Sequence, residues 1–264
     1  MQMKSLLFKL ALFLISWGIC THLLAKPILK IAFSDNKAPY SNSTCQCGVE
    51  FEIVQTIVKN MGYELEPHFA PNKRMLLMLK SGEVDGIIGV IENKPRDNGF
   101  TTKPYIRFQN VALTLQDRHL PIESLKDLKG LKVAAFQNAS LNLGYEYAYA
   151  ISTASEYEEV SPQLLQNKLL YGGRTDAVIA DLYIFLASNQ LVKEQVNTMQ
   201  KLDLHYVFPA TEYVLEFHNK QFRDAFNQQL QPKNLKKIYQ KLADKYFQPL
   251  MSGAVFLPMP SWMN

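Results

Sequence analysis

Hydrophobic and polar positions follow two periods along the first third of the chain. Residues 29–33 alternate apolar and polar side chains, which is typical of a strand. Between residues 50 and 61 the apolar side chains recur at intervals of three and four, which predicts a helix that ends at Gly62. The same reasoning predicts further elements, with strands at 63–69 and 84–91 and a helix at 75–80. The order strand, helix, strand, helix, strand predicts the α/β fold class.

The pattern then restarts. Residues 132–136 form a short apolar stretch followed by a polar turn, and residues 177–180 form another apolar strand that ends at Asp181. A helix is predicted between them, over residues 164–170, because its apolar side chains stop at a pair of glycines. More strand is expected within 206–217, and helix within 222–247 with an interruption near Pro232. The sequence therefore predicts a second α/β unit.

The N-terminus has the layout of a secretory signal peptide. Two lysines, Lys4 and Lys9, precede an apolar run, and a small residue, Ala25, comes before the next charge. A membrane span needs about 20 apolar residues, and the uncharged run here is shorter. We predict that residues 1–25 are a signal peptide cleaved after Ala25, with an uncleaved anchor as the alternative. The sequence around Cys20 does not resemble a lipoprotein cleavage box, so lipidation is not expected.

Composition and charge exclude several classes of protein. The 264 residues are 47% hydrophobic and 20% charged, which favours a globular fold over a disordered chain. The net charge is +4, from 28 basic and 24 acidic residues, and it falls to +2 when Lys4 and Lys9 are removed with the signal peptide. Such a weak bias does not suggest a nucleic-acid partner. The expected mature chain has 239 residues (264 minus 25), enough for one large domain or two lobes.

The cysteines are too few for a disulfide-rich scaffold. Export would place Cys45 and Cys47 in an oxidising compartment, where a disulfide between them is favoured over metal binding. With His68 they would make only an incomplete zinc set, and the sequence has no phosphate-binding loop or other cofactor motif. We therefore expect neither a metal nor a cofactor.

Two stretches of the chain share one pattern. LKSGEVDGII at 79–88 and GGRTDAVIAD at 172–181 each end a helix with glycine, turn through an aspartate and enter a buried strand. Together with GVEFEI at 48–53, LKGLKVA at 128–134 and KYF at 245–247, the chain resembles the family 3 extracellular solute-binding proteins, of the type that serves amino-acid ABC transporters. The resemblance runs from about Ile28 to Phe247.

The resemblance implies the type II periplasmic binding protein fold, with two lobes that close on a ligand about a hinge of two chain crossings. Lobe 1 would comprise residues 26–115 and 210–264, and lobe 2 residues 116–209. The implied protein is a periplasmic monomer that binds a small molecule and meets an inner-membrane permease or sensor. Ligands of such sheets lie at the carboxyl ends of strands.

The resemblance also implies binding residues. In amino-acid-binding members an acidic residue at the position of Asp181 holds the ligand ammonium; the alternative is that Asp181 caps a helix that begins near Leu182. An arginine near the position of Arg96 holds the ligand carboxylate, although here it could equally be a surface residue. Glu92 nearby would repel a carboxylate, so either Glu92 points outward or the ligand carries a positive group.

Four further residues complete the expected site. Arg74 matches an arginine at the start of the second helix, where family members usually have a tryptophan two residues earlier and this chain has Asn72. Tyr40 could supply the missing aromatic wall, or could be ordinary loop packing. Gln137 and Ser140, in the polar turn after residue 136, could donate to an anionic group or simply form the turn.

Three functions are compatible with these sequence features. The first is capture of a small polar solute, such as an amino acid or a relative, for an ABC-type transporter. The second is a sensor that presents its lobes to a membrane receptor. The third is a dehydratase-like enzyme on the same scaffold, with Glu92 as its acid or base. We favour binding without catalysis, because no nucleophile, base and orienting group are grouped in the sequence.

Overall fold

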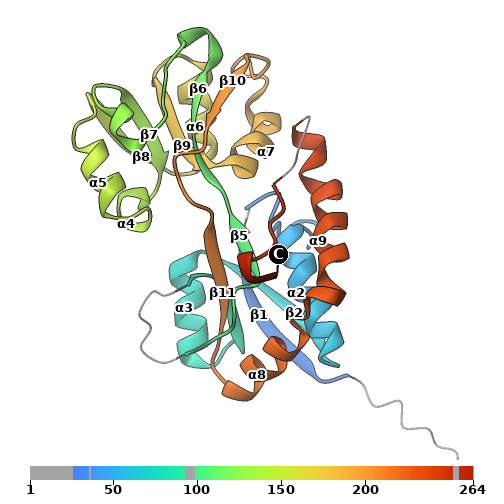
Figure 1. Cartoon of the computed structure of the whole chain (residues 1–264). Helices are drawn as coiled ribbons and strands as arrows, with labels where there is room; N and C mark the ends of the chain where they lie inside the picture. The colour runs from blue at the N-terminus through green and yellow to red at the C-terminus, as the bar shows by residue number, and fades with distance from the viewer. Residues whose placement is uncertain (1–25, 36, 93–98, 252–255, 264) are drawn as a thin grey trace, which may run out of the picture.

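The strands form two separate sheets, one in each half of the molecule (Figure 1). The computed structural model describes residues 26–35, 37–92, 99–251 and 256–263. The first-lobe sheet has the order β2-β1-β3-β11-β4, and β5 also pairs with β11. The second-lobe sheet has the order β10-β6-β9-β7-β8. The two predicted α/β units are therefore confirmed, each as a lobe with its own sheet.

Both lobes combine parallel and antiparallel pairing. In the first lobe β1 runs parallel to β2 and β3, and β11 is antiparallel to β3. The elements of this lobe are β1 (Ile28–Ser34), α2 (Val49–Asn60), β2 (Glu64–Ala70), α3 (Asn72–Ser81), β3 (Gly86–Ile91), β4 (Phe100–Thr101), β5 (Ile106–Phe108), β11 (Thr211–Phe217), α8 (Lys220–Gln229), α9 (Pro232–Tyr246), and the 3-10 helices η3 (Gln248–Leu250) and η4 (Ser261–Met263).

In the second lobe β7 runs parallel to β8 and β9, while β6 is antiparallel to β9 and β10. Its elements are β6 (Asn110–Leu115), η1 (Gln116–Arg118), η2 (Leu125–Leu128), β7 (Lys132–Phe136), α4 (Ala139–Asn142), α5 (Tyr145–Ile151), β8 (Glu156–Val160), α6 (Leu164–Tyr171), β9 (Ala177–Asp181), α7 (Leu182–Val192) and β10 (Leu202–His205).

The predicted strands and helices all occur, with small shifts at their ends. Gly82 ends α3 in a left-handed conformation, at φ 73°, as the glycine after residues 75–80 predicted. The helical stretch at 222–247 is divided into α8 and α9, and Pro232 opens α9, where its missing N–H costs nothing. The sequence did not predict the strands between residues 100 and 115, strand β8 or helix α5.

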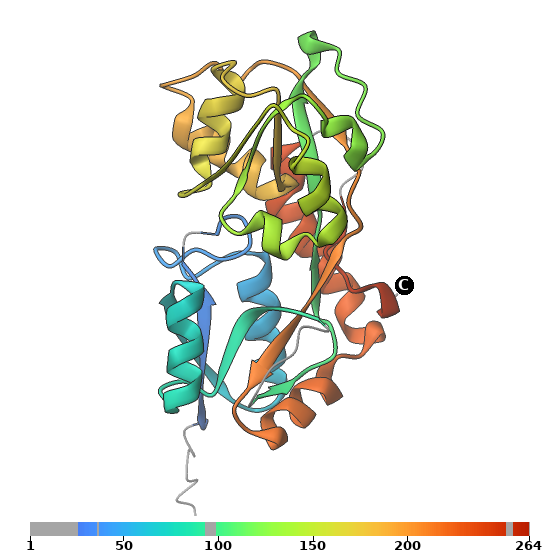
Figure 2. The same ribbon diagram turned by 90° about the vertical axis from the view of Figure 1, so that its left-hand side faces the viewer.

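The two lobes are joined by two chain segments that run side by side, green and orange in Figure 2. The chain leaves the first lobe at Gln109, between β5 and β6, and returns through residues 206–210. The Gln109 side chain ties the crossings together, because its Nε2 donates to the backbone oxygen of Phe208 at 3.0 Å. The lobe boundary expected after residue 115 would separate β6 from β9 and β10, the strands with which it pairs. If each strand is assigned to the lobe that holds its sheet, the boundary lies at Gln109.

Candidate functional site

A cavity of about 420 Å³ lies between the lobes. Its walls come from the carboxyl ends of four strands, from the start of α3 and from the crossing strands. Residues that follow or end those strands include Ser34 and Lys37 after β1, Gln137 after β7, Gln163 after β8, and Asp181 at the end of β9. The carboxyl ends of strands in an α/β sheet are where ligands bind, so this cavity is the candidate site.

The loop between β1 and α2 is held rigidly at the rim of the cavity. The first N–H groups of α2 have no partner within the helix. That of Val49 donates to the Pro39 carbonyl, and those of Glu50 and Phe51 donate to the Tyr40 carbonyl. Gly48 makes this approach possible: its φ is 129°, and a Cβ there would lie 2.3 Å from the Tyr40 oxygen. The turn from Lys37 is closed by the Lys37 N–H, which donates to the Ser41 carbonyl at 2.9 Å.

Asp181 lies at the junction of the lobes with its acceptor positions filled. One carboxylate oxygen accepts from the N–H groups of Tyr183 and Ile184, both at 3.0 Å, and so caps α7. The other accepts from the Tyr40 hydroxyl at 3.1 Å and the Gln109 N–H at 3.2 Å. A carboxylate has about four acceptor positions. The capping interpretation of Asp181 is therefore confirmed, although the side chain also lines the cavity.

The surroundings of Asp181 shift its pKa in opposite directions. Burial raises the pKa of Asp181 to about 6, while the hydrogen bonds and the positive charge of Lys37 act to lower it. Burial also raises the pKa of Glu50, a second buried carboxyl that accepts from the Tyr105 hydroxyl at 2.5 Å. Lys37 acts on both carboxyls. Its positive charge thus acts on one buried acid in each lobe without cancelling the effect of burial on either pKa.

Lys37 itself is held by aromatic rings. Its Nζ lies 4.2 Å from the centre of the Phe108 ring and 5.5 Å from that of Tyr213, both on crossing strands. A cation over an aromatic face is attracted by the ring's quadrupole. Within the described residues Nζ makes no hydrogen bond, and no carboxylate oxygen lies within the 4.0 Å of an ion pair. The ammonium is thus fixed in the cavity wall with its hydrogen-bond donors unused.

The polar turn after β7 is occupied by a side chain of the same lobe. The carboxylate of Glu159, on β8, accepts from the N–H of Asn138 at 2.6 Å and from the N–H and hydroxyl of Ser140 at 2.9 and 2.7 Å. Burial alone would raise the pKa of Glu159, but these bonds and one from the Tyr157 hydroxyl leave it lowered. The donors that were expected to meet an anionic ligand thus already bind an anion.

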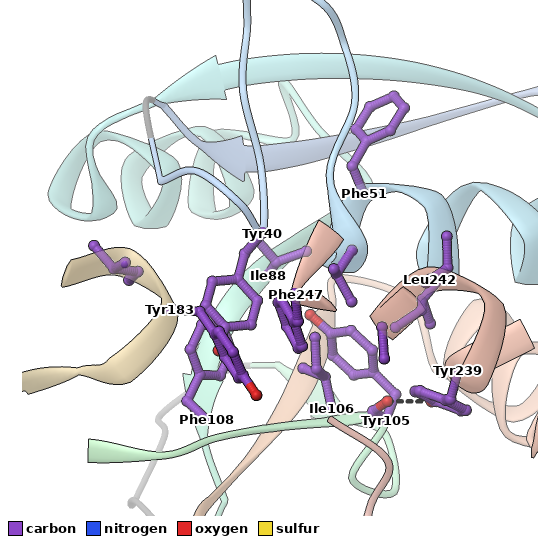
Figure 3. Close-up of a cluster of buried hydrophobic side chains, with 14 of the residues drawn as sticks. Tyr40, Phe51, Ile88, Tyr105, Ile106, Phe108, Tyr183, Tyr239, Leu242 and Phe247 are labelled. Carbon is purple, nitrogen blue, oxygen red and sulfur yellow. Dashed lines mark hydrogen bonds between the residues drawn. The ribbon is translucent and has the colours of Figure 1, made fainter. Parts of the chain in front are cut away.

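Aromatic side chains from both lobes pack against one another in a buried cluster (Figure 3), and one of them, Phe108, also lines the cavity. Tyr183 of α7 stacks on Phe247, with ring centres 3.8 Å apart, and Tyr40 meets both Phe247 and Phe108. Tyr40 is fully buried and is not part of the cavity wall. Its hydroxyl nevertheless carries the hydrogen bond from the first lobe to Asp181 in the second. The residue lies behind the site and links its two halves.

Two of the other residues expected at the site lie elsewhere. Arg74 is in the first turn of α3 and points to Glu83, with Nη2 2.8 Å from the carboxylate, and it does not line the cavity. Glu92 follows β3, where its N–H donates to the Glu212 carbonyl, and it is likewise absent from the wall. Gln137 does line the cavity, whereas Ser140 lies behind it on Glu159. Arg96 and the expected signal peptide lie outside the described residues.

The cysteines and histidine considered for a metal do not form a cluster. Cys45 and Cys47 are joined in a disulfide, in the loop before α2. His68 lies on β2, and its Nε2 is 2.9 Å from the Oε1 of Glu66. In the part of the chain that the structure describes, no three His, Cys, Asp or Glu side chains are grouped as metal ligands. The described helices also include none of the length and apolar character that a membrane crossing requires.

Several residues of the cavity wall were missed by the sequence analysis. Lys37 lies three positions before Tyr40, in the loop from which Tyr40 was considered as a wall of the site, but the sequence analysis did not consider Lys37. Phe108 and Asn110 belong to the crossing segment, whose strands had no clear periodicity. The wall after β8 was missed because β8 itself was not predicted. Its sequence, EYEEV, is largely polar and half-exposed.

The described wall suits reversible binding of a small polar molecule. It combines amides and hydroxyls with apolar side chains, and Lys37, Asp181 and the exposed Asp35 are its charges. Hydrogen bonds from such groups orient a ligand inside a concave site. The cavity lies between two bodies joined by two crossings, and this arrangement permits closure by a hinge.

Known proteins share this architecture. A histidine kinase sensor domain with similarity to periplasmic binding proteins aligns with a TM-score of 0.66 and 19% identity, covering 88% of this chain and 98% of the other. The substrate-binding protein of an amino acid ABC transporter aligns with a TM-score of 0.61 and 20% identity, covering 84% and 99%. At such identities the likeness concerns the fold, which is that of the type II periplasmic binding proteins.

Sequence comparison identifies the family. A protein of Bacillus subtilis (strain 168), the probable ABC transporter extracellular-binding protein YckB, is 30% identical over 148 residues, which are 54% of this chain and 50% of the relative. The match thus spans half of that relative's length. The model of the bacterial extracellular solute-binding proteins, family 3, matches residues 29–249. The chain belongs to this family.

Proposed function

We propose that the protein is a periplasmic binding protein that captures a small polar solute, an amino acid or a related compound, and delivers it to an ABC-type transporter. The observation that carries the proposal is the cavity between the lobes, lined from both by hydrogen-bonding side chains. The names of the similar proteins support the transporter, and the expected signal peptide supports the periplasm. The ligand-binding role expected for Gln137, which lines the cavity, belongs to this proposal.

Binding can be tested directly on residues 26–264. A ligand that binds only the folded state raises the melting temperature by mass action. We expect at least one compound from a panel of amino acids, amines, carboxylates and sugars to do so, with one-to-one stoichiometry in calorimetry. A panel without any such compound would contradict the proposal.

Delivery to a transporter needs a separate test. Cells that lack the gene should accumulate the radiolabelled hit more slowly than wild-type cells, and plasmid-borne protein should restore the rate.

A second candidate, a sensor, is favoured by the likeness to a histidine kinase sensor domain. For a sensor, uptake would be unchanged and transcription in response to the hit would be lost.

An enzyme would convert the bound compound into a product that can be detected. We infer that the protein binds without turnover, because Glu92, the residue considered as an acid or base, is not in the cavity wall. Prolonged incubation of the hit with the protein should return the compound unchanged in mass spectrometry. Formation of a product that a boiled sample does not give would favour the enzyme instead.

A further inference from the structure

We propose that Lys37 is the anion-binding residue of the cavity, and that the ligand is a small carboxylate whose negative group is placed on the Lys37 ammonium. The inference deepens the proposed function and rests on it. It differs from what the resemblance implied, because there the charged contacts were Asp181, for an ammonium, and arginines, for a carboxylate.

The Lys37 ammonium has unused hydrogen-bond donors. An ammonium has three N–H donors and no acceptor. The Lys37 Nζ makes no hydrogen bond or ion pair to any described residue, although Lys37 is half-buried and lines the cavity. The Phe108 ring, 4.2 Å away, holds the position of the charge but accepts no proton in a conventional hydrogen bond. A ligand oxygen in the cavity could therefore accept hydrogen bonds from this ammonium.

Asp181 has no acceptor position left for a ligand ammonium. Its two oxygens receive four donors, from Tyr183, Ile184, Tyr40 and Gln109. A ligand cation would have to displace a helix cap or the bond between the lobes. Asp35 is the other carboxylate of the described wall, and it is exposed, so water screens its charge.

The same cavity wall also carries neutral hydrogen-bond donors. The Asn72 oxygen accepts from the Ser34 hydroxyl at 3.0 Å, which leaves the amide nitrogen to donate to a ligand. The amide nitrogens of Asn110 and Gln163, also in the wall, have no partner within the described residues. One positive charge among neutral donors matches a carboxylate, with its single charge, better than a phosphate that carries about two.

The test compares wild type with Lys37→Gln and Lys37→Met. The probes are four groups of compounds at equal concentration: α-amino acids, carboxylates without an amine, amines without a carboxylate, and inorganic phosphate. We expect the hits to carry a carboxylate, and both variants to bind them at least tenfold more weakly in calorimetry. Lys37→Met keeps an apolar side chain against Phe108, so a loss shared by both variants reports on the charge.

The matched control is Lys103→Gln. The Lys103 Nζ also lies over an aromatic ring, that of Trp262 at 5.6 Å, but outside the cavity, and the control should bind like wild type. Hits that are amines or phosphate, or carboxylates that bind both Lys37 variants as tightly as wild type, would overturn the inference and leave the proposed function standing. If no compound binds wild type, the proposed function fails and the inference with it.

Discussion

The two faces of the cavity differ in how their polar groups are used. On the second-lobe face, Asp181 and the turn at Asn138 and Ser140 are bonded within the protein, to donors and to a carboxylate respectively. On the first-lobe face, the Lys37 ammonium has no such partner among the described residues. Groups that are already paired stabilise the fold, whereas an unpaired charge in a cavity wall is available to a ligand. The paired groups of the second-lobe face thus contribute to stability, whereas the charge available for recognition lies on the first-lobe face.

The largest expected effect is on stability, and it comes from a substitution on the second-lobe face, where the polar groups are paired within the protein. In Asp181→Ala, helix α7 loses its cap, and the Tyr40 hydroxyl and Gln109 N–H lose a buried acceptor. Caps contribute about 1 kcal/mol and each orphaned buried group costs about 1–3 kcal/mol, so we expect the free energy of unfolding to fall by about 3 kcal/mol. Urea denaturation measures the change.

The matched control for Asp181→Ala is Asn219→Ala. Asn219 caps α8 with one bond, to the Gln221 N–H at 2.7 Å, and its loss should cost about 1 kcal/mol. Equal losses in the two variants would mean that the bonds to Tyr40 and Gln109 contribute nothing.

The pH dependence of stability separates Asp181 from ordinary surface acids. Its pKa is raised from 3.8 to about 6 in the folded state, so the folded protein binds the proton more tightly than the unfolded chain. Stability from this group is complete below pH 4 and is lost as pH rises through 6. Relative to Asp181→Asn, wild type should lose up to about 3 kcal/mol between pH 4 and 7. Parallel curves for the two proteins would refute the raised pKa.

Glu159 should show the opposite sign and a smaller effect. Its pKa is lowered in the folded protein, so its contribution is present above the unfolded value and is lost as pH falls through the folded one. Glu159→Gln keeps one acceptor oxygen and loses the charge, and should cost about 1 kcal/mol at pH 7. Glu158→Gln, an exposed neighbour, is the control and should leave stability unchanged. A cost shared by both would point to strand β8 and not to the turn.

The smallest expected effect on stability is that of Lys37→Gln. Only a cation–aromatic contact and a long-range charge effect are removed, so the free energy of unfolding should change by no more than about 1 kcal/mol. Together with a large loss of ligand affinity, this result would separate recognition from stability most sharply. A loss of several kcal/mol would instead assign Lys37 a structural role, as the partner of Asp181 and Glu50.

Much of the fold could be predicted because burial imposes a period on the sequence. β3 and β9 are nearly continuous apolar runs, and α2 repeats its apolar side chains at three and four, as elements packed on a sheet must. The segment that crosses between the lobes was harder to predict. All six residues of β6 are buried, Asn110 and Thr114 included, so polarity along the chain did not mark the strand. Its place in the second sheet is set by pairing with β9.

The site was predicted less well than the fold. Asp181 and Gln137 were located because glycine and aspartate turns fix where strands end, and strand ends form the site. The sequence could not show that Tyr40 and Asp181, 141 positions apart, share a hydrogen bond. Nor could it show that Glu159 occupies the turn at Ser140, because that contact depends on the parallel register of β7 and β8.

The sequence by itself determined the α/β class, the two units and the positions where ligand-facing turns follow strands. These are local consequences of side-chain period and of glycine at helix ends. Only the tertiary structure decided which polar groups are already paired. Pairing depends on distances between residues far apart in the chain, and those distances are set by how sheets and crossings pack. For this reason the charge left free for a ligand, that of Lys37, emerged only from the folded molecule.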